Sequence, residues 1–377
     1  MTSPSGYRPR VAYIITESEI GGAQTHVRDL YVGLRDRVDG TLVAGGNGPL
    51  FAQMAALGAQ TVHINALDNS LSPLHLLRTV RHVAAALRKN PPDLIHAHSA
   101  KGGAVGRMVG AYLRIPVVYT VHGFGFKVAA PWRQRWAARL AECALAPLTA
   151  HMICVSDAEA QMASALPVRR SRVHVIHNGV ADTEQRSQPA SSVTQIVMTA
   201  RLAAPKRPDV LIRAAADGII PTGASVVLVG DGPQRAALEH QASAVASTIR
   251  FAGNVDNVPD VLAAAQLFVL FSDHEGLPIS ILEAMRAGLP ILASDLPGIR
   301  EQLVHGESGW LIDHRDTIAV GDALRMLTTD AARRQTLGAH ARQRYEALFE
   351  ITTMVERTYS VYERALQDSP SRQHGSR

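Results

Sequence analysis

Short runs of branched apolar residues alternate with longer helical segments from one end of the chain to the other. Strands that are buried on both faces of a parallel sheet form such continuous apolar runs, and helical crossovers connect them. The pattern therefore predicts an α/β protein built from βα units. The predicted strands form two series, a first over residues 11–16, 41–44, 61–64, 93–96, 117–121, 152–155 and 173–176, and a second over residues 195–199, 225–229, 249–252, 267–270 and 290–293.

A polar stretch without apolar periodicity, residues 182–192, separates the two series of strands. Such a segment between two α/β halves is typical of an interdomain linker, and we expect a central cleft between the domains there. The last helical segment has no following strand and is expected to pack back on the first domain. The predicted parts are a disordered N-terminal end over residues 1–10, a first domain over 11–182, a linker over 183–192, a second domain over 193–350, a returning helix over 351–366 and a disordered tail over 367–377.

Hydrophobic residues make up 46% of the 377 positions and charged residues 19%, which is the balance of a soluble globular protein. The two cysteines, Cys143 and Cys154, support neither a disulfide framework nor a cysteine zinc site, which fits a reducing cytosol. The chain has neither a signal peptide pattern nor a run of about 18 apolar residues, so an exported or integral protein is not expected. The formal net charge of +5 favours anionic partners, and nucleotides, phospholipid head groups and nucleic acid all remain open on charge alone.

A turn with two glycines, Gly21 and Gly22, follows the first predicted strand. Glycine lets backbone N–H groups approach a ligand closely, and the start of the helix predicted over residues 24–34 favours an anion. A tight turn required only for packing explains the same residues equally well. Gly230 stands in a second strand-to-helix turn, V-G-D-G-P, in which Pro233 is expected in the first helical turn.

A third turn lies in residues 271–288 of the second half. Pro278 is expected to begin a helix over residues 278–287, and Gly288 to end it in a left-handed conformation. Leu277 would then occupy the cap position without a side-chain oxygen. The first N–H groups of the helix would remain for a phosphate or a sugar hydroxyl.

Two glutamates flank the start of this helix, Glu275 just before it and Glu283 in its second turn. Both can approach one ligand, and the alternative is a solvated acid pair. Their spacing within E-G-L-P-x-S-x-L-E-A-M resembles the signature of the family 4 retaining glycosyltransferases of the GT-B fold. The resemblance extends in the family's order over about residues 11–366, through T-V-H-G-F, T-A-R-L-x-x-x-K, V-G-D-G-P, F-x-G-x-V and S-D-x-P-G-I-R-E.

This resemblance implies two Rossmann-like parallel-sheet domains, the second of which holds a nucleotide-sugar donor. Arg201 and Lys206 match residues on the diphosphate, where two fixed cations would stabilise the charge that develops on a departing diphosphate. Glu283 matches a residue on the ribose hydroxyls. Glu275 and His122 match residues at the transferred sugar, and core packing is the alternative for His122. The expected catalytic residues are His122, Glu275, Arg201 and Lys206, and the expected donor-binding residues are Gly21, Gly22, Arg201, Lys206, Gly230, Val255, Asn257, Gly276, Leu277, Pro278, Ile279 and Glu283.

Two positions depart from the family pattern. Arg207 stands where a glycine usually follows the lysine, which adds a third possible phosphate contact. Ala181 separates Asp182 from N-G-V, so no role is carried over to that acid. No Asp-x-Asp pair follows a strand to hold Mg²⁺ against a diphosphate, and two fixed cations make a metal unnecessary. We therefore expect no metal and no other cofactor.

Basic and aromatic residues gather in two helical segments of the first half. Trp132, Trp136 and three arginines precede an apolar stretch within residues 131–150, and residues 73–89 add positive charge. The pattern favours contact with an anionic membrane surface, and a solvated helix face is the alternative for each segment. The T-V-H-G-F run also resembles transferases of bacterial exopolysaccharide and capsule assembly, which implies a glycan or a polyprenyl-diphosphate-linked acceptor.

The resulting prediction is a retaining glycosyltransferase of bacterial surface polysaccharide synthesis, cytoplasmic and peripheral on the inner face of the membrane. Its expected partners are a nucleotide sugar, with UDP favoured over GDP, the acceptor and the membrane surface, but no nucleic acid. A sugar-nucleotide epimerase or hydrolase of the same fold is a second possibility, which the basic helices disfavour. A non-catalytic nucleotide-binding scaffold is a third, which the joint presence of Arg201, Lys206, Glu275 and Glu283 disfavours.

Overall fold

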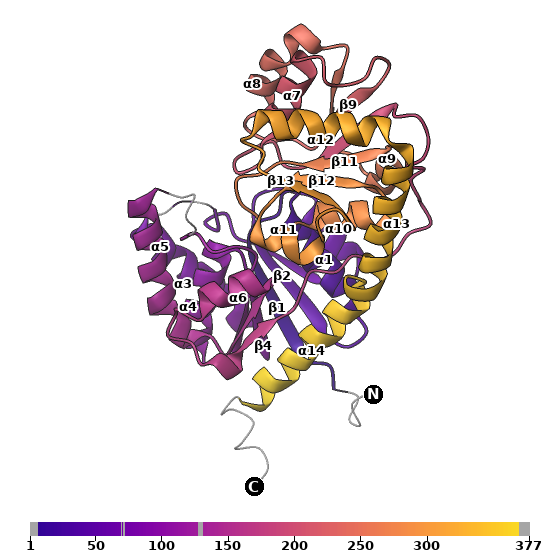
Figure 1. Cartoon of the computed structure of the whole chain (residues 1–377). Helices are drawn as coiled ribbons and strands as arrows, with labels where there is room; N and C mark the ends of the chain where they lie inside the picture. The colour runs from indigo at the N-terminus through magenta and orange to yellow at the C-terminus, as the bar shows by residue number, and fades with distance from the viewer. Residues whose placement is uncertain (1–6, 69, 71, 127–130, 369–377) are drawn as a thin grey trace. The chain divides into compact units, whose positions relative to one another are not determined.

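The chain divides into two compact units in a computed structural model, and each unit is described by itself. The first comprises Met1–Asn178 and Ile351–Arg377, and the second comprises Gly179–Glu350. Figure 1 follows the chain by colour, and the yellow C-terminal helix α14 (Ile351–Gln367) belongs to the first unit. The described residues are 7–68, 70, 72–126 and 131–368, so most of the ends predicted to be disordered lies outside them, although Arg10 already begins β1.

Parallel strands form the sheet of the first unit, in the order β3-β2-β1-β4-β5-β6-β7. The direction of the crossovers therefore reverses between β1 and β4. The strands are β1 (Arg10–Glu17), β2 (Asp39–Gly45), β3 (Gln60–His63), β4 (Leu94–His98), β5 (Val117–Val121), β6 (His151–Cys154) and β7 (Val173–Val175). The helices are α1 (Gly22–Leu34), α2 (Leu50–Ala56), α3 (Pro73–Lys89), α4 (Ala100–Leu113), α5 (Trp132–Leu145), α6 (Asp157–Ala163) and α14, with short 3₁₀ turns at Ala146–Leu148 and Arg170–Arg172.

Apolar side chains of β1 point alternately to two cores, as the two-residue period of a strand requires. Tyr13 lies in one core with side chains of α1, α2 and α14, among them the buried Tyr362. Ile14 lies in the other core with side chains of α3 and α4, among them Val83 and Val109. The sheet of the first unit is thus covered by helices on both faces.

The second unit repeats the design with the strand order β10-β9-β8-β11-β12-β13, in which the crossovers reverse between β8 and β11. The strands are β8 (Gln195–Thr199), β9 (Ser225–Val229), β10 (Ile249–Gly253), β11 (Leu267–Leu270), β12 (Ile291–Ser294) and β13 (Trp310–Ile312). The helices are α7 (Pro208–Ala216), α8 (Arg235–Gln241), α9 (Val258–Ala263), α10 (Ile279–Arg286), α11 (Pro297–Gln302), α12 (Thr317–Thr329) and α13 (Ala331–Leu348), with a 3₁₀ turn at Ser243–Val245.

The observed strands confirm the predicted α/β class. The predicted ranges 117–121, 195–199, 225–229 and 267–270 coincide with β5, β8, β9 and β11. Strand β13 was not predicted, and it pairs with β12 at one end of the strand order. Three residues are too few to establish an apolar period, so the sequence carries little signal for β13.

The polar stretch predicted as a linker belongs to the second unit, because the division between the units falls after Asn178. Arg334 of α13 is only 2% exposed, and its guanidinium donates to the carbonyl oxygens of Pro189 at 2.7 Å and Ser191 at 2.8 Å. A buried cation needs acceptors, and the backbone of this polar stretch supplies them. Part of this polar stretch is therefore packed against α13 through its backbone.

Two helices begin later than the sequence indicated. Helix α10 starts at Ile279, and the extended Pro278 (φ −66°, ψ 123°) is its N-cap, so Leu277 lies one residue before the cap. Helix α8 starts at Arg235, two residues after Pro233, because a turn closed by the Arg235 N–H on the Gly232 carbonyl precedes it. The predicted end of α10 is confirmed, since Gly288 adopts a positive φ of 74°.

Helix α5 is attached to the first unit through a buried ion pair. Glu142 is its one buried residue, and both carboxylate oxygens accept from Arg107 of α4, at 2.8 and 3.0 Å. Arg107 is fully buried and also lies 4.2 Å from the centre of the Tyr119 ring. A charged pair therefore makes the buried contact of α5, and the partly buried Cys143 adds an apolar one. None of the described helices is both long enough and apolar enough to cross a membrane.

Replacing Glu142 by Ala should destabilise the first unit by about 3–5 kcal/mol, because the buried Arg107 would lose its carboxylate partner. Urea unfolding followed by circular dichroism measures the effect. The double replacement of Arg107 by Met and Glu142 by Leu should recover most of the loss. Glu239→Ala, which breaks an exposed pair with Arg235 on α8, is the control and should leave the midpoint unchanged. Equal midpoints for Glu142→Ala and the control would contradict this role of the pair.

Candidate functional site

The crossover reversal between β8 and β11 lies where most of the predicted donor-site residues are found. Ligands of open α/β sheets bind outside the carboxyl ends of the strands at such a point. Arg201 follows the end of β8, and Glu275 follows the end of β11. The strand order therefore places the candidate binding site of the second unit at the carboxyl ends of β8 and β11.

Backbone hydrogen bonds join the loop after β8 to the loop after β11. The Arg207 N–H donates to the Phe271 carbonyl at 2.9 Å, and the Asp273 N–H donates to the Pro205 carbonyl at 2.9 Å. This pairing brings Lys206 Nζ to 2.5 Å from Glu275 Oε1. The two side chains are 18% and 9% exposed, so the pair is largely shielded from solvent. Two of the four predicted catalytic residues thus form one ion pair.

Arg201 and Arg207 differ sharply in their surroundings. Arg201 is exposed, and its side chain makes no hydrogen bond or ion pair with the described residues. Arg207 donates to both carboxylate oxygens of Asp209 at 2.9 Å and reaches Asp273 at 3.4 Å. These carboxylates raise the pKa of Arg207, chiefly through the Asp209 hydrogen bond. Arg207, suggested as a third phosphate contact, is therefore already held by two acids.

Close backbone approaches shape both loops. A side chain at Gly230, whose φ is +123°, would overlap the Ala200 carbonyl oxygen next to Arg201. A side chain at Gly298 would overlap the carbonyl oxygen of Gly276. The V-G-D-G-P and S-D-x-P-G-I-R-E motifs thus each place a glycine against one of the site loops. Their predicted importance has a structural basis in this packing.

The start of α10 carries no side-chain cap on its N-cap residue, Pro278. The Pro278 carbonyl accepts from the buried Gln302 Nε2 at 2.9 Å, which fixes the loop that contains the buried Gly276 and Leu277. Ile279 is the first helical residue, and Glu283 lies half-buried one turn later. Amide groups and a carboxylate therefore occur together at this helix end, where an anion is favoured.

Val255 and Asn257 lie on the loop after β10, at the same edge of the sheet but beyond β9. Asn257 is exposed, precedes α9 as its N-cap and hydrogen-bonds to Asp260 through its side-chain amide. Gly230 accordingly lies between these residues and Arg201 in strand order. The predicted donor-site residues of the second unit follow the carboxyl edge of its sheet.

The remaining predicted residues, Gly21, Gly22 and His122, belong to the first unit. Gly21 is the N-cap of α1 with an extended φ of −179°, and Gly22 is the first helical residue. His122 follows β5, and its Nε2 lies 3.2 Å from Nδ1 of His98 at the end of β4. Burial, together with the neighbouring His26, lowers the pKa of His122 well below its usual value. His122 is therefore a neutral imidazole at neutral pH.

Two histidines that were not predicted as site residues, His98 and His26, surround His122. His98 is fully buried and His26 is 3% exposed, and burial lowers the pKa of His26 to about 4. The H-A-H alternation in β4 was a visible signal, because a polar residue at every second position of a central strand is unusual. The position of His26 of α1 beside His122 has no such signal in the sequence, since it depends on tertiary packing.

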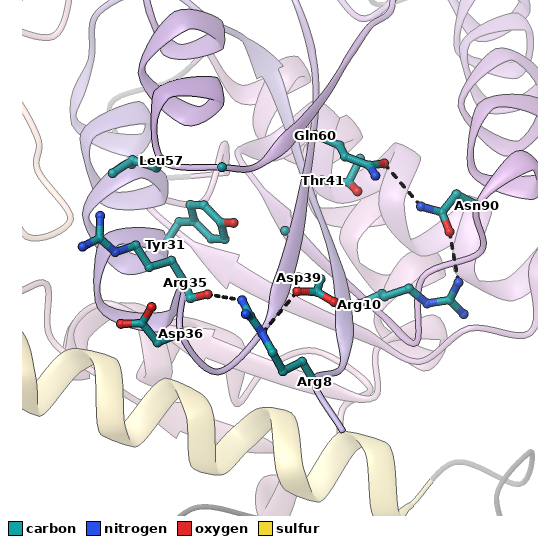
Figure 2. Close-up of a pocket in the computed structure, with 12 residues that line it drawn as sticks. Arg8, Arg10, Tyr31, Arg35, Asp36, Asp39, Thr41, Leu57, Gln60 and Asn90 are labelled. Carbon is teal, nitrogen blue, oxygen red and sulfur yellow. Dashed lines mark hydrogen bonds and ion pairs between the residues drawn. The ribbon is translucent and has the colours of Figure 1, made fainter. Parts of the chain in front are cut away.

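A cavity of about 570 Å³ lies at the opposite, amino-terminal edge of the same sheet (Figure 2). Two of its three arginines are engaged, since Arg8 pairs with Asp39 and Arg10 donates to Asn90 at 3.0 Å. None of the predicted site residues lines it. In open α/β sheets the ligand crevice lies at the carboxyl edge, so this cavity is not the candidate site.

Comparison with known proteins gives two family matches. Residues 20–184 match the model described as Glycosyltransferase Family 4, and residues 193–330 match the model described as Glycosyl transferases group 1. The two matches occur in the order of the two units and together span most of the chain.

Individual relatives agree with these matches. The UDP-Gal:alpha-D-GlcNAc-diphosphoundecaprenol alpha-1,3-galactosyltransferase of Escherichia coli is 26% identical over 350 residues, which cover 87% of this chain and 89% of the relative. The O-antigen biosynthesis glycosyltransferase WbnH of Escherichia coli is 28% identical, with 81% of this chain and 86% of the relative covered.

Solved structures share the architecture. HepE from Anabaena in complex with UDP and glucose superposes with a TM-score of 0.82 at 19% identity, covering 94% of this chain and 100% of HepE. Sucrose-phosphate synthase from Thermosynechococcus elongatus gives 0.78 at 21% identity, covering 96% of this chain and 100% of the synthase. The predicted GT-B fold, with two parallel sheets covered by helices, is confirmed.

Proposed function

Because the chain belongs to the family 4 glycosyltransferases, we propose that it is a retaining enzyme of bacterial surface polysaccharide synthesis. It transfers a sugar from a nucleotide diphosphate, UDP rather than GDP, to a glycan or a polyprenyl-diphosphate-linked acceptor. The names of two relatives support this choice, since one is named for UDP-Gal and a GlcNAc-diphosphoundecaprenol acceptor and the other for O-antigen biosynthesis. The observation that carries the proposal is the Lys206–Glu275 pair beside the exposed Arg201 at the crossover reversal.

Arg201 and Lys206 bind the diphosphate of the donor in this proposal. A leaving diphosphate gains negative charge as the glycosidic bond breaks, and fixed cations in a shielded site stabilise that charge without reorganisation. Arg201 has a guanidinium free for bidentate contact with phosphate oxygens, and the ammonium of Lys206 is held by the paired loops. The start of α10 adds its N–H groups to the same anion.

Donor binding replaces one partner of the ion pair by another. Lys206 contacts Glu275 at 2.5 Å in the donor-free protein, and the diphosphate competes for the same ammonium. Glu275 is then released towards the sugar, where a carboxylate stabilises positive charge that develops at the anomeric carbon. His122, a neutral imidazole in the first unit, contacts a sugar hydroxyl. Retention follows from front-face attack, in which the leaving diphosphate accepts the acceptor proton.

Two glutamate variants separate the roles in this site. Glu283→Ala should weaken UDP binding and raise the donor KM about tenfold to hundredfold, because a charged hydrogen-bond acceptor for the ribose is lost. Glu275→Ala should lower kcat while UDP binding stays equal or becomes tighter, because Lys206 is freed for the diphosphate. Titration calorimetry with UDP and steady-state kinetics measure these effects.

Lys206→Ala is the matched partner variant and should weaken UDP binding, the opposite of Glu275→Ala. Circular dichroism on all variants checks that α10 remains folded. If Glu275→Ala and Glu283→Ala both weaken UDP binding equally and leave kcat alone, the carboxylate of Glu275 only helps to hold the nucleotide.

The transfer step needs no divalent metal in this proposal, since Arg201 and Lys206 supply the charge that Mg²⁺ provides in other transferases. Activity should therefore be unchanged in excess EDTA. The test is an assay with a nucleotide sugar after dialysis against EDTA, with and without added Mg²⁺ or Mn²⁺. Loss of activity that either ion restores would reveal a required metal.

An exposed apolar stripe on α5 supports binding to an anionic membrane surface. Trp132, Trp136 and Leu140 follow one another at four-residue spacing, and their exposed fractions are 65%, 61% and 65%. Arg133 lies 5.3 Å from the ring of Trp132, and α3 adds the exposed Leu74. Both helices contact α4. Aromatic and basic side chains of this kind anchor helices at the lipid head groups.

Replacing both Trp132 and Trp136 by Ser should weaken binding to vesicles that contain anionic lipid by about tenfold to hundredfold, because two large apolar side chains no longer enter the interface. Vesicle sedimentation measures the binding. UDP binding should not change, since α5 belongs to the first unit. Ile318→Ser removes an exposed apolar side chain on α12 and is the control that should bind as the wild type does. Unchanged vesicle binding in the tryptophan variant would rule out this surface.

A further inference from the structure

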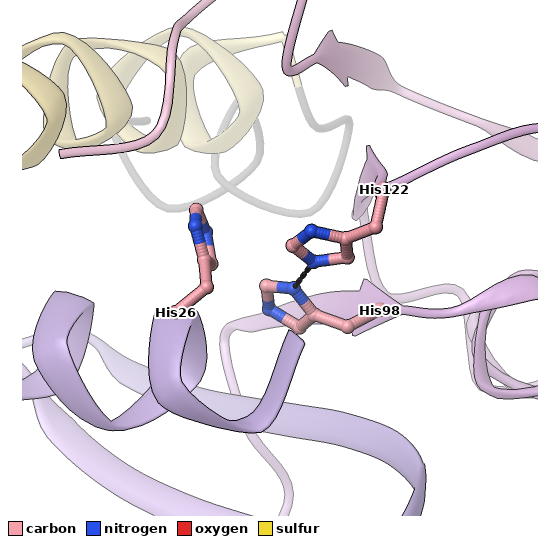
Figure 3. Close-up of side chains that lie close together, drawn as sticks. All are labelled: His26, His98 and His122. Carbon is pink, nitrogen blue, oxygen red and sulfur yellow. Dashed lines mark hydrogen bonds between the residues drawn. The ribbon is translucent and has the colours of Figure 1, made fainter. Parts of the chain in front are cut away.

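Three histidines from separate elements meet at the carboxyl edge of the first sheet. His26 comes from α1, His98 ends β4 and His122 follows β5. Each offers a ring nitrogen, and these nitrogens all lie within 4.8 Å of one another. Figure 3 shows His26 beside the hydrogen-bonded rings of His98 and His122. The rings of His26 and His122 meet edge to face at 4.8 Å between centres.

Two of these imidazoles bury a nitrogen without a hydrogen-bond partner. His26 Nε2 and His98 Nε2 are both buried, and neither has a partner among the described residues. The neighbouring His96 differs, because Tyr362 and Thr120 satisfy both of its nitrogens at 2.6 and 2.7 Å. Packing alone does not explain the difference, since a buried polar atom without a partner is costly.

The hydrogen bonds that are present prepare the rings as metal ligands. His26 Nδ1 lies 3.0 Å from Asn178 Oδ1, and because a carbonyl oxygen only accepts, Nδ1 carries the proton and Nε2 presents its lone pair. A ligating histidine usually donates its second nitrogen to such an oxygen. Neutral imidazoles are the form that binds a metal.

The spacing of His98 and His122 fits two ligands of one tetrahedral ion. Two nitrogens at about 2.0–2.1 Å from Zn²⁺ lie about 3.3–3.4 Å apart. His98 Nδ1 and His122 Nε2 are 3.2 Å apart, and a tautomer change within one ring turns both into lone pairs. The proton of His98 then lies on Nε2, so the orphaned nitrogen that the ion would satisfy is His26 Nε2. His122 is the partly exposed member, so an ion has a route from solvent. Three imidazoles with a fourth position open are a common zinc environment.

We infer that His26, His98 and His122 form a binding site for a borderline divalent metal ion of the Zn²⁺ class, with Asn178 as the hydrogen-bond acceptor that orients His26. The ion is separate from catalysis, for which no metal is required in the proposed function. Because His122 is also the proposed sugar contact, an ion at this site withdraws that imidazole from the donor sugar. Metal binding therefore inhibits transfer, a consequence that rests on the proposed function.

Equilibrium dialysis with Zn²⁺ and titration with Co²⁺ test the site directly. The EDTA-treated wild type should take up one Zn²⁺ per chain, and Co²⁺ should give the intense visible absorption of a tetrahedral complex. His26→Phe, which keeps a ring of similar size, should weaken binding at least about tenfold. His82→Ala removes an exposed histidine of α3 and should bind as the wild type does.

Asn178→Asp gives a result that misfolding cannot imitate. A carboxylate makes the imidazole of His26 more basic, so binding should become tighter, by up to about tenfold. Zinc uptake by His26→Phe equal to that of the wild type, or no Co²⁺ absorption in the wild type, would overturn the site. Binding that follows these expectations but leaves transfer uninhibited would support the site and would instead contradict the role proposed for His122.

Discussion

Backbone hydrogen bonds between two loops hold the candidate site of the second unit together. The loops after β8 and β11 run side by side because the crossover direction reverses between these strands, and the bonds of Arg207 and Asp273 fix their register. Lys206 and Glu275 then meet without either needing a side-chain conformation imposed by a ligand. Much of the conformational entropy of these loops is therefore lost during folding, before a donor binds.

A second constraint governs α5, the helix with the exposed tryptophan stripe. The buried residue of α5 is Glu142, which accepts from Arg107, whereas its tryptophans are exposed. The desolvation of these charges is offset by a bidentate bond and by the Tyr119 ring.

The sequence was sufficient for features that depend on local periodicity and on motif residues. Strands such as β8 and β11 were predicted with their observed bounds, and Arg201 and Glu275 were placed correctly after them. The features without a signal in the sequence depend on contacts between distant segments. Three such features arise from tertiary packing, which no local pattern encodes. They are the Lys206–Glu275 pair, the hydrogen bonds of Arg207 with Asp209 and Asp273, and the bond from Arg334 to the backbone of residues 182–192.

The two histidines of β4 also differ through their tertiary contacts. His96 and His98 lie two residues apart on one face of β4, yet their ring nitrogens differ in hydrogen bonding. Tyr362 of the C-terminal helix and Thr120 satisfy both nitrogens of His96, whereas the one hydrogen bond of the His98 ring to a described residue is with His122. The buried Nε2 of His98 has no partner among the described residues, and an unsatisfied buried nitrogen opposes folding. The cost is retained at the carboxyl edge of the sheet, where ligands of this class of fold bind.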